Sequence, residues 1–402
     1  DDRVAELFVP VILIISLLTF FIWVFFGGID VVSHGLFAAL SVLVVACPCA
    51  VGLATPVALA AGLNKAARNH ILIRDTSALE QMRNVDVVVF DKTGTLTEGH
   101  PTVIGWLWAQ GQEEHYKDVL LAAESTSDHP LAEAIVTALE GEEQVIPAHL
   151  DGFENITGKG VRVAYQGAEY WVGSHKLLKD YQANLSDILA DMLTQYESDG
   201  NSIVYFGREN DLLAVIAIKD QLRVTSMEAI RELRIQDIEI CMLTGDGERT
   251  ASSVAGSLGI MRFVADAMPD DKEDFIHKLQ LQGKTVAMVG DGVNDAQALS
   301  CADVSIAMGK GTDTLMDTAM ITLRTSDLLL LPKVFRLSRQ TVSLMYRNLF
   351  WAFIYNTVGI FVAAGVLYPV YDILLSPALA GAAMALSCVS VALSSLRLSS
   401  RF

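Results

Sequence analysis

Long uncharged apolar runs occur in pairs at the two ends of this chain, and residues 64–348, which mix polar and apolar positions, separate the pairs. The runs cover residues 7–26, 36–63, 349–370 and 373–396. Each is long enough for the roughly 20 residues that a helix needs to cross a bilayer. Because soluble cores rarely contain four such runs, the pattern predicts four transmembrane helices, with both chain ends and the central region on one side of the membrane.

Basic residues indicate which side that is. They lie beside the inner ends of the second, third and fourth runs: Lys65, Arg68, Arg74, Arg347, Arg397 and Arg401. Cytoplasmic segments next to membrane spans carry an excess of such residues. We therefore expect a multi-pass protein whose central region is cytosolic. The basic residues do not identify the membrane, and a bacterial inner membrane is our working assumption.

Composition narrows the classes of protein. The chain has 402 residues, which suggests two or three domains, and 52% of them are hydrophobic, as four spans require. A net charge of −18 argues against a nucleic-acid partner. Five cysteines without the paired spacing of a disulfide scaffold fit a reducing compartment.

The central region repeats a pattern in which an apolar strand ends at a carboxylate or at phosphate-binding residues. Predicted strands at 85–90, 212–218, 238–243 and 286–289 lead into Asp91, Asp220, Thr244-Gly245-Asp246 and Gly290-Asp291. Helical patterns follow two of them, at 249–258 and 294–299. Strand, loop and helix in repetition predict a doubly wound, Rossmann-like parallel sheet. The carboxylates are then expected to meet at one edge of that sheet.

Asp91 is the candidate nucleophile, because an aspartate at this edge can attack a phosphoryl group and form an aspartyl-phosphate. Gly94 allows a tight turn there. Asp291 and Asp295 are hard oxygen ligands suited to Mg²⁺. A cation and two hydrogen-bond donors for the transferring group complete the set: Lys272, Thr244 and Asn294. Each acidic residue alone is also compatible with a solvated turn, but four strands that end this way favour a site.

Residues 98–211 are expected to form an inserted α+β domain, with helical patterns at 116–123 and 131–139 and strands within 160–172. Glu124, His129, Gly158 and Gly160 are candidates for a nucleotide pocket in it. A single Gly-x-Gly or a lone histidine is weak support by itself.

The second span contains Cys47-Pro48-Cys49. Residues two apart on a regular helix point about 200° from each other, so an intact helix would separate the two thiols. Pro48 cannot donate to the Val44 carbonyl and opens the helix locally. Two thiolates there would form a soft site for Cu(I) or for Zn²⁺ and similar ions. The alternative is two buried cysteines beside a chance kink.

Neutral groups in the later spans favour a monovalent ion. Tyr355 and Asn356 lie in the third span and Met384, a soft thioether, lies in the fourth. Neither span has an interior charge to balance a divalent cation, so Cu(I) fits better than Zn²⁺.

These stretches together resemble the haloacid-dehalogenase-type core of P-type ATPases. The motifs that carry the resemblance are D-K-T-G-T at Asp91, T-G-D at Thr244 and G-D-G-V-N-D from Gly290. The resemblance implies catalytic roles for Lys92 and Asp246. It also implies Mg²⁺ coordination by Asp91, Thr93, Asp291 and Asp295.

The resemblance extends to the heavy-metal, class IB branch. Glu124 and His129-Pro130 look like its ATP-binding S-E-H-P motif, and Gly158, Gly160 and Gly173 match its nucleotide-domain glycines. C-P-C, Y-N and M-x-x-S-S are the pattern of its copper exporters. For this chain that implies Cu(I) ligation by Cys47, Cys49, Tyr355, Asn356 and Met384, with Ag(I) left open and a cytosolic copper chaperone as a possible partner.

The chain also departs from the family pattern. Cys388 stands in place of the second serine of M-x-x-S-S, Gln297 and Gln221 replace prolines, and Ser174 replaces an asparagine. We expect Cys388 to be a small buried residue rather than a ligand. The chain has no T-G-E motif of an actuator domain and no C-x-x-C metal-binding motif, and it begins at Asp1. We expect a partial pump without the amino-terminal spans, actuator and metal-binding domains.

The prediction is therefore ATP-driven Cu(I) export through an aspartyl-phosphate. The expected domains are spans at 1–75, a phosphorylation domain at 76–97 and 212–335, a nucleotide-binding domain at 98–211, and spans at 336–402. Alternatives are a zinc, cadmium or silver pump, a non-transporting metal-binding membrane protein with an inactive catalytic domain, and a membrane-anchored phosphatase. A phosphatase would need a second acid where Thr93 stands.

Overall fold

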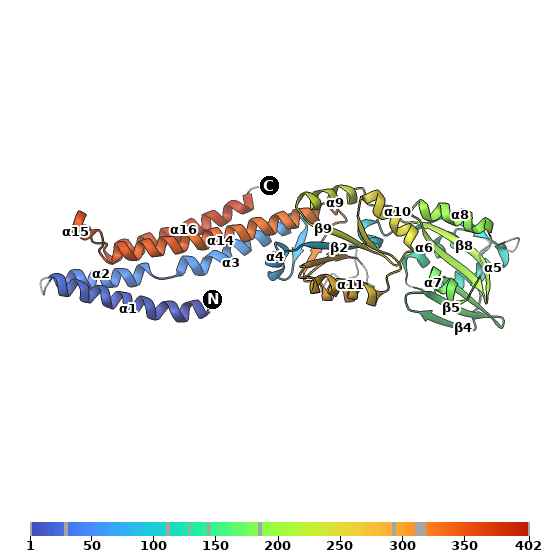
Figure 1. Cartoon of the computed structure of the whole chain (residues 1–402), viewed down its shortest axis with the longest axis horizontal. Helices are drawn as coiled ribbons and strands as arrows, with labels where there is room; N and C mark the ends of the chain where they lie inside the picture. The colour runs from blue at the N-terminus through green and yellow to red at the C-terminus, as the bar shows by residue number, and fades with distance from the viewer. Residues whose placement is uncertain are drawn as a thin grey trace. The chain divides into compact units, whose positions relative to one another are not determined.

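The chain forms two compact units in this computed structural model, one of residues 1–69 and 334–402, here the helical unit, and one of residues 70–333, here the α/β unit (Figure 1). The structure describes residues 2–27, 31–109, 113–127, 129–142, 145–183, 187–291, 295–309 and 319–400.

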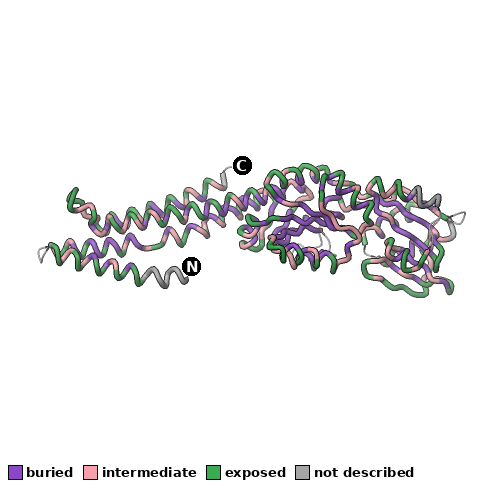
Figure 2. Tube along the Cα trace, viewed as in Figure 1, coloured by how far each residue is buried: buried purple, intermediate pink, exposed green. Residues whose placement is uncertain are grey.

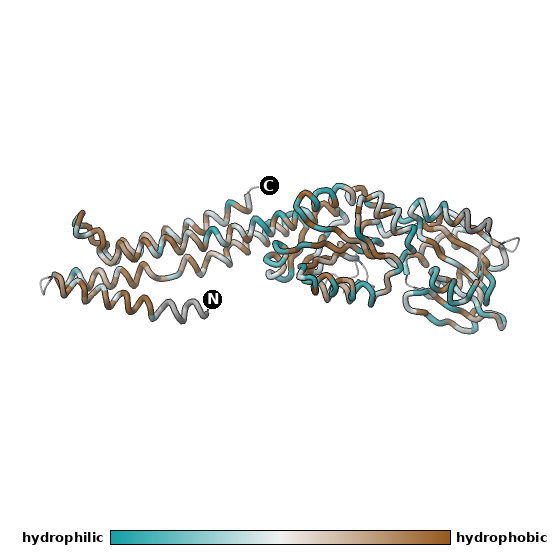
Figure 3. Tube along the Cα trace, in the orientation of Figure 1, coloured by the Kyte–Doolittle hydropathy of each residue, from teal (hydrophilic) through white to brown (hydrophobic). Residues whose placement is uncertain are grey.

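Long apolar helices make up the helical unit. They are α1 (Asp2–Gly27), α2 (Val32–Val45), α3 (Cys49–Arg68), α14 (Leu330–Ala363) and α16 (Pro377–Ser400), with a short α15 (Tyr368–Tyr371). Helix α2 packs against α1 and α16, and α3 packs against α16. Many large apolar side chains remain exposed, among them Phe21, Phe353 and Leu386. Exposed stretches alternate with buried ones along these helices, whose residues are mostly apolar (Figures 2 and 3).

Two stretches among the described residues are long and apolar enough to cross a membrane, Val32–Arg68 and Pro377–Leu398, while Pro10–Phe26 is a shorter apolar helix. The helices predicted for the third and fourth apolar runs, residues 349–370 and 373–396, have the wrong limits. Helix α14 ends at Ala363, and Gly365 follows with a φ of +91°, a conformation that favours glycine. Helix α16 begins only at Pro377, because proline is well suited to the first turn of a helix.

The first sheet of the α/β unit has the strand order β1-β13-β12-β11-β2-β9-β10. All neighbours are parallel except β1 and β13. The strands are β1 (Ile71–Ile73), β2 (Val87–Asp91), β9 (Glu239–Leu243), β10 (Arg262–Val264), β11 (Val286–Gly290), β12 (Val304–Met308) and β13 (Ile321–Leu323). Its helices are α4 (Ser77–Met82), α9 (Ser226–Ile235), α10 (Glu248–Leu258), α11 (Pro269–Leu281) and α12 (Ala296–Cys301). The doubly wound sheet that the sequence predicts is confirmed, with α9 and α11 on opposite faces (Figure 1).

Burial explains why these strands are continuous apolar runs. Val87, Val89 and Met288 are fully buried and pack against Ile276 of α11 and Leu299 of α12. Strands covered on both faces have no polar side to alternate with. The central strands β11, β2 and β9 therefore form a rigid base whose carboxyl ends carry the candidate site.

The second sheet is antiparallel, with the order β3-β8-β7-β6-β5-β4. Its strands are β3 (Thr102–Trp108), β4 (Gly152–Ile156), β5 (Gly160–Tyr165), β6 (Ala168–Gly173), β7 (Ser202–Arg208) and β8 (Asp211–Lys219). Helices α5 (Glu113–Glu124) and α6 (Pro130–Glu140) share one core with this sheet, and α7 (His175–Asp180) and α8 (Asp187–Ser198) share another. The inserted α+β domain has the helices and strands that its pattern predicts.

One strand prediction is wrong. Residues 212–218 do not join the parallel sheet; they lie in β8, which pairs with β3 and β7 in the antiparallel sheet. Because helices cover both faces of this sheet, β8 is buried on both sides and has the same continuous apolar pattern as a parallel strand. The inserted domain therefore continues through Lys219.

Candidate functional site

Asp91 ends β2, which lies between β11 and β9 at the centre of the parallel sheet. Its side chain is buried, and two contacts hold it in place. The backbone N–H of Thr93 donates to Asp91 Oδ2 at 3.0 Å, and the Lys272 Nζ lies 2.6 Å from Asp91 Oδ1. The carboxylate is therefore fixed at the sheet edge where parallel α/β sheets bind ligands.

Lys272 comes from the first turn of α11 and bridges two carboxylates. Its Nζ lies 2.6 Å from Asp91 Oδ1 and 2.7 Å from Asp295 Oδ1. Burial alone would lower the pKa of the Lys272 ammonium, but the two carboxylates outweigh burial and raise that pKa. Lys272 thus stays a cation at the position that the sequence predicted for it.

Asp91, Asp291 and Asp295 form a cluster in which one carboxylate oxygen of each residue lies within 4.8 Å of those of the other two. Burial raises the pKa of Asp291 to about 7, and the charges of Asp91 and Asp295 add to this, partly offset by Arg223. Burial and Asp91 likewise raise the pKa of Asp295 to about 7, against the effect of Lys272. Among the described residues, Lys272 is the lysine that pairs with this cluster, so its three carboxylates outnumber that cation. The donor set therefore fits a hard divalent cation such as Mg²⁺.

Gly94 is needed for this cluster to close. Its φ is +70°, and a Cβ there would overlap the Asp291 carboxylate. Arg223 holds the same loop, because its guanidinium donates to the carbonyls of Gly94 and Thr95. Asp220 follows β8 of the other sheet, and its carboxylate accepts a hydrogen bond from Thr97, which keeps it close to the site. The role of Arg223 was missed from the sequence, since no local pattern links it to residues 94–95.

Lys92 and Asp246 form a second buried ion pair beside Asp91. The Lys92 Nζ also donates to Ser202 Oγ at 3.0 Å, and Thr244 Oγ1 donates to Asp246 Oδ2 at 3.1 Å. Burial would raise the pKa of Asp246, but Lys92 outweighs burial and lowers it. Ser202 begins β7 of the antiparallel sheet. It was missed because nothing in its neighbourhood resembles a motif.

The predicted nucleotide residues lie at three places in the inserted domain. Burial raises the pKa of Glu124, the last residue of α5, to about 7. His129 precedes α6, and its Nδ1 accepts from the Leu131 N–H at 3.2 Å. Desolvation by surrounding protein atoms lowers the pKa of the His129 imidazole, although the residue is still exposed to solvent. The charged groups that also act on this imidazole are Asp246, Lys92, Asp91 and Lys272.

The predicted glycines are close-packed. Gly160 and Gly173 are opposite each other on β5 and β6, and a Cβ on either would overlap the backbone of the facing strand. Gly158 has a φ of +69° and lies against the Met268 side chain, at 2.7 Å from where its Cβ would be. Close backbone contacts therefore require glycine at positions 160 and 173, and the positive φ favours glycine at position 158. Asn294, predicted as a hydrogen-bond donor, lies outside the described residues.

In the helical unit, the helix breaks at Cys47-Pro48. Helix α2 ends at Val45 and α3 begins at Cys49, as the proline predicts. The sulfurs of Cys47 and Cys49 lie on the same side and are joined as a disulfide. Asn356 Nδ2 lies 3.5 Å from the Cys47 carbonyl oxygen. The break thus brings the two cysteines and Asn356 together.

The other residues predicted in the metal path are less closely grouped. Tyr355 is exposed and stacks on Trp351 of the same helix, with ring centroids 5.7 Å apart. Met384 is partly exposed on α16. Cys388, expected to be buried, is partly buried and packs against small buried side chains around Ala50 and Ala352.

Comparisons with known proteins agree with these features. The family described as "Hydrolase: haloacid dehalogenase-like hydrolase" matches residues 85–303. A copper-exporting P-type ATPase of Legionella pneumophila is 43% identical over 397 residues, which are 99% of this chain and 54% of the relative. A silver exporting P-type ATPase of Salmonella typhimurium is 44% identical over 402 residues, 99% of this chain and 48% of the relative.

The crystal structure of a zinc-transporting PIB-type ATPase in the E2.Pi state matches with a TM-score of 0.70 and 33% identity over 99% of this chain and 63% of its own. The chain thus spans about half the length of the curated relatives it matches. The likeness covers the helices and the α/β unit together. The chain belongs to the haloacid dehalogenase-like hydrolase family and, within it, to the heavy-metal P-type ATPases.

Proposed function

We propose that Asp91 accepts the γ-phosphoryl group of ATP. The observation that carries this proposal is the arrangement around Asp91: a buried carboxylate at the end of a central parallel strand, held by Thr93 and Lys272, with Asp291 and Asp295 beside it. A carboxylate oxygen of Asp91 attacks the γ-phosphorus, the bond from phosphorus to the bridging oxygen breaks, and ADP leaves.

The chain's own residues supply the electrostatics of this step. The Lys272 ammonium lies where it can offset charge on the transferring oxygens. Lys92 is held by Asp246 and Ser202 and adds a second positive charge. Asp91, Asp291 and Asp295, with Thr93, would hold Mg²⁺, which neutralises phosphate charge when it is bound. Thr93 occupies the position where a phosphatase would carry its second acid, which favours a lasting aspartyl-phosphate.

The inserted domain would bind the nucleotide. Buried Glu124 and exposed His129 offer hydrogen-bonding groups. Gly160 and Gly173, at the facing ends of β5 and β6, and the nearby Gly158 present backbone without side chains, which a nucleotide could approach closely. The charges around His129 belong to the phosphorylation residues, as expected where one ATP molecule reaches both.

The transported ion would be Cu(I), with Cys47 and Cys49 in their reduced form as the principal ligands. The helix break that aligns these sulfurs favours a soft ion, and the neutral Asn356 beside Cys47, with the neutral Tyr355 and Met384 of α14 and α16, favours a monovalent one. Relatives named for copper, silver and zinc all resemble the chain. The intact protein would work in a bacterial inner membrane with a cytosolic α/β unit, an actuator region and a copper chaperone as delivery partner.

Phosphorylation from [γ-³²P]ATP in the presence of Cu(I), Ag(I), Zn²⁺ or no added metal tests this function. The expected result is acid-stable, hydroxylamine-labile label that Cu(I) stimulates. Asp91→Asn should abolish the label, and Asp270→Asn, an exposed carboxylate of α11, should keep it.

Stimulation by Zn²⁺ alone would replace copper with zinc in this proposal. Label that ignores all metals in the wild-type chain would favour a catalytic unit without transport. Label that persists in Asp91→Asn would refute the assignment of the nucleophile.

A further inference from the structure

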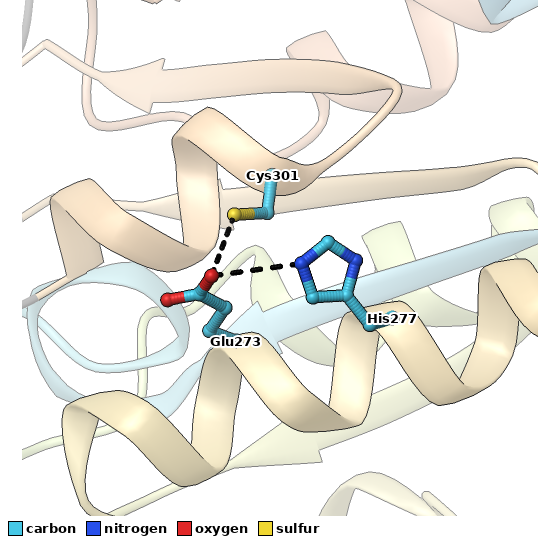
Figure 4. Close-up of side chains that lie close together, drawn as sticks. All are labelled: Glu273, His277 and Cys301. Carbon is cyan, nitrogen blue, oxygen red and sulfur yellow. Dashed lines mark hydrogen bonds and ion pairs between the residues drawn. The ribbon is translucent and has the colours of Figure 1, made fainter.

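A second group of metal-ligating side chains lies on the α/β unit, on α11 and at the end of α12 (Figure 4). Glu273 and His277 are one turn apart on α11, so they lie on the same helix face, and Cys301 is the last residue of α12. Glu273 Oε1 lies 3.5 Å from His277 Nε2 and 3.4 Å from Cys301 Sγ. All three ligand atoms lie within 4.8 Å of one another.

Gln280 supports this group from behind. Its Oε1 lies 3.1 Å from His277 Nδ1, and its Nε2 donates to the Cys301 carbonyl at 2.9 Å. An amide oxygen only accepts, so the Nδ1 of His277 must carry the hydrogen. The neutral ring then leaves Nε2, the nitrogen nearest Glu273, free to bind a cation. Metal-binding histidines are typically oriented in this way by a partner on their other nitrogen.

We propose that Glu273, His277 and Cys301 form a binding site for a borderline divalent cation of the Zn²⁺ class. A thiolate, an imidazole and a carboxylate together are a donor set that Zn²⁺ prefers and Mg²⁺ does not. Bonds of 2.0–2.3 Å to a tetrahedral ion place neighbouring ligand atoms roughly 3.3–3.6 Å apart. The observed 3.4 and 3.5 Å separations match this spacing.

The exposed surroundings supply the rest of the site. Glu273 and Cys301 are partly exposed and His277 is exposed, so a water molecule can complete four-coordination. The alternative without a metal is a surface ion pair between Glu273 and His277, in which Cys301 has no ligand role. Such a pair would bind no metal through sulfur, which gives the two interpretations different spectroscopic outcomes.

A cation at this site would tie α11 to α12. Lys272 precedes Glu273 directly, and Asp295 directly precedes α12. Catalytic candidates therefore lie at the N-terminal ends of the same two helices, and the proposed ligands lie farther along them. Metal binding is expected to raise the unfolding temperature of the α/β unit as well as to give an optical signal.

Co²⁺ in place of Zn²⁺ tests the site in the full chain with Cys47→Ser and Cys49→Ser, so that the paired thiols of the helical unit contribute nothing. We expect one Co²⁺ with a thiolate-to-metal charge-transfer band, which Zn²⁺ abolishes by displacement. The carboxylates around Asp91 cannot produce this band. Cys301→Ser should remove it, and Gln280→Ala should weaken binding by roughly 10–100-fold.

His277→Gln and His149→Gln are a matched pair, because both histidines are exposed on the α/β unit. Binding should weaken at least tenfold in the first variant and stay unchanged in the second. Any of three results would overturn the proposal. These are the absence of a charge-transfer band at saturating Co²⁺, a band that persists in Cys301→Ser, and equal Co²⁺ binding by the two histidine variants. Unfolding curves without metal show whether each variant is folded. If Cys301→Ser does not fold, metal binding by His277→Gln tests the proposal instead.

Discussion

Replacing Asp291 by asparagine should stabilise the metal-free chain while removing its activity. The pKa of Asp291 is about 7 against an ordinary 3.8, because burial and two neighbouring carboxylates disfavour its charge. At 1.36 kcal/mol per pKa unit, the charged form costs about 4 kcal/mol in the folded state. Asp291 is partly exposed, and solvent screening reduces this to about 1–2 kcal/mol. Asparagine keeps the size of the side chain and removes that cost.

The sign of the pH dependence follows from the raised pKa. The folded state holds the Asp291 proton up to a higher pH than the unfolded state does, so this contribution to stability is present below about pH 4. It is lost as pH rises toward about 7. The gain in Asp291→Asn should therefore be small at pH 5 and largest at pH 8. For a unit of this size, 1–2 kcal/mol corresponds to roughly 2–8 °C in unfolding temperature.

Scanning calorimetry of the full chain in detergent, with and without Mg²⁺, measures this effect. Wild type should gain stability from Mg²⁺, because a ligand that binds the folded state stabilises it. Asp291→Asn should start higher at pH 8 and gain little from Mg²⁺, while Asp270→Asn, exposed on α11, should behave as wild type. An Asp291→Asn chain that is less stable at pH 8 and still gains fully from Mg²⁺ would refute the reasoning.

Three further predictions follow from the same geometry. Lys272→Met should slow phosphorylation by roughly 10²–10³-fold, because the cation between Asp91 and Asp295 is removed. Rapid-quench kinetics measure this rate, and an unchanged rate would argue against the role of Lys272. Gly160→Ala should destabilise the α/β unit by about 1–3 kcal/mol in chemical denaturation, since its Cβ would overlap the backbone of β6, and a neutral result would contradict the packing. Cys47→Ser should abolish metal stimulation of phosphorylation, whereas Cys388→Ser, in a packed cluster, should keep it within about twofold; loss in both variants would assign Cys388 to the metal path.

Local patterns were sufficient for most of the catalytic edge. Apolar strands that end at Asp91 and Asp291 could be recognised because strands buried on both faces are short continuous runs, and a parallel sheet places their ends together. The helix break at Pro48 was equally local, because proline removes a hydrogen bond wherever it occurs inside a helix.

Contacts between distant segments could not be predicted. Ser202 reaches Lys92 from another sheet, and Arg223 holds the Gly94 loop from 129 residues away. The group formed by Glu273, His277 and Cys301 needs two helices that the sequence does not show to be neighbours. Strand β8 was assigned to the wrong sheet for a related reason, since its burial pattern does not reveal which strands pair with it.

Identification of the phosphorylated residue tests the central claim most directly. The full chain would be labelled with ATP and Mg²⁺, reduced with borohydride, which converts an aspartyl-phosphate to homoserine, and sequenced by mass spectrometry. If Asp91 is the phosphorylated residue, homoserine should appear at position 91 alone, and none should appear without ATP. Two results would contradict the assignment of Asp91. One is homoserine at position 291, 295 or 246 in place of position 91, and the other is no homoserine at all in protein that carries acid-stable label.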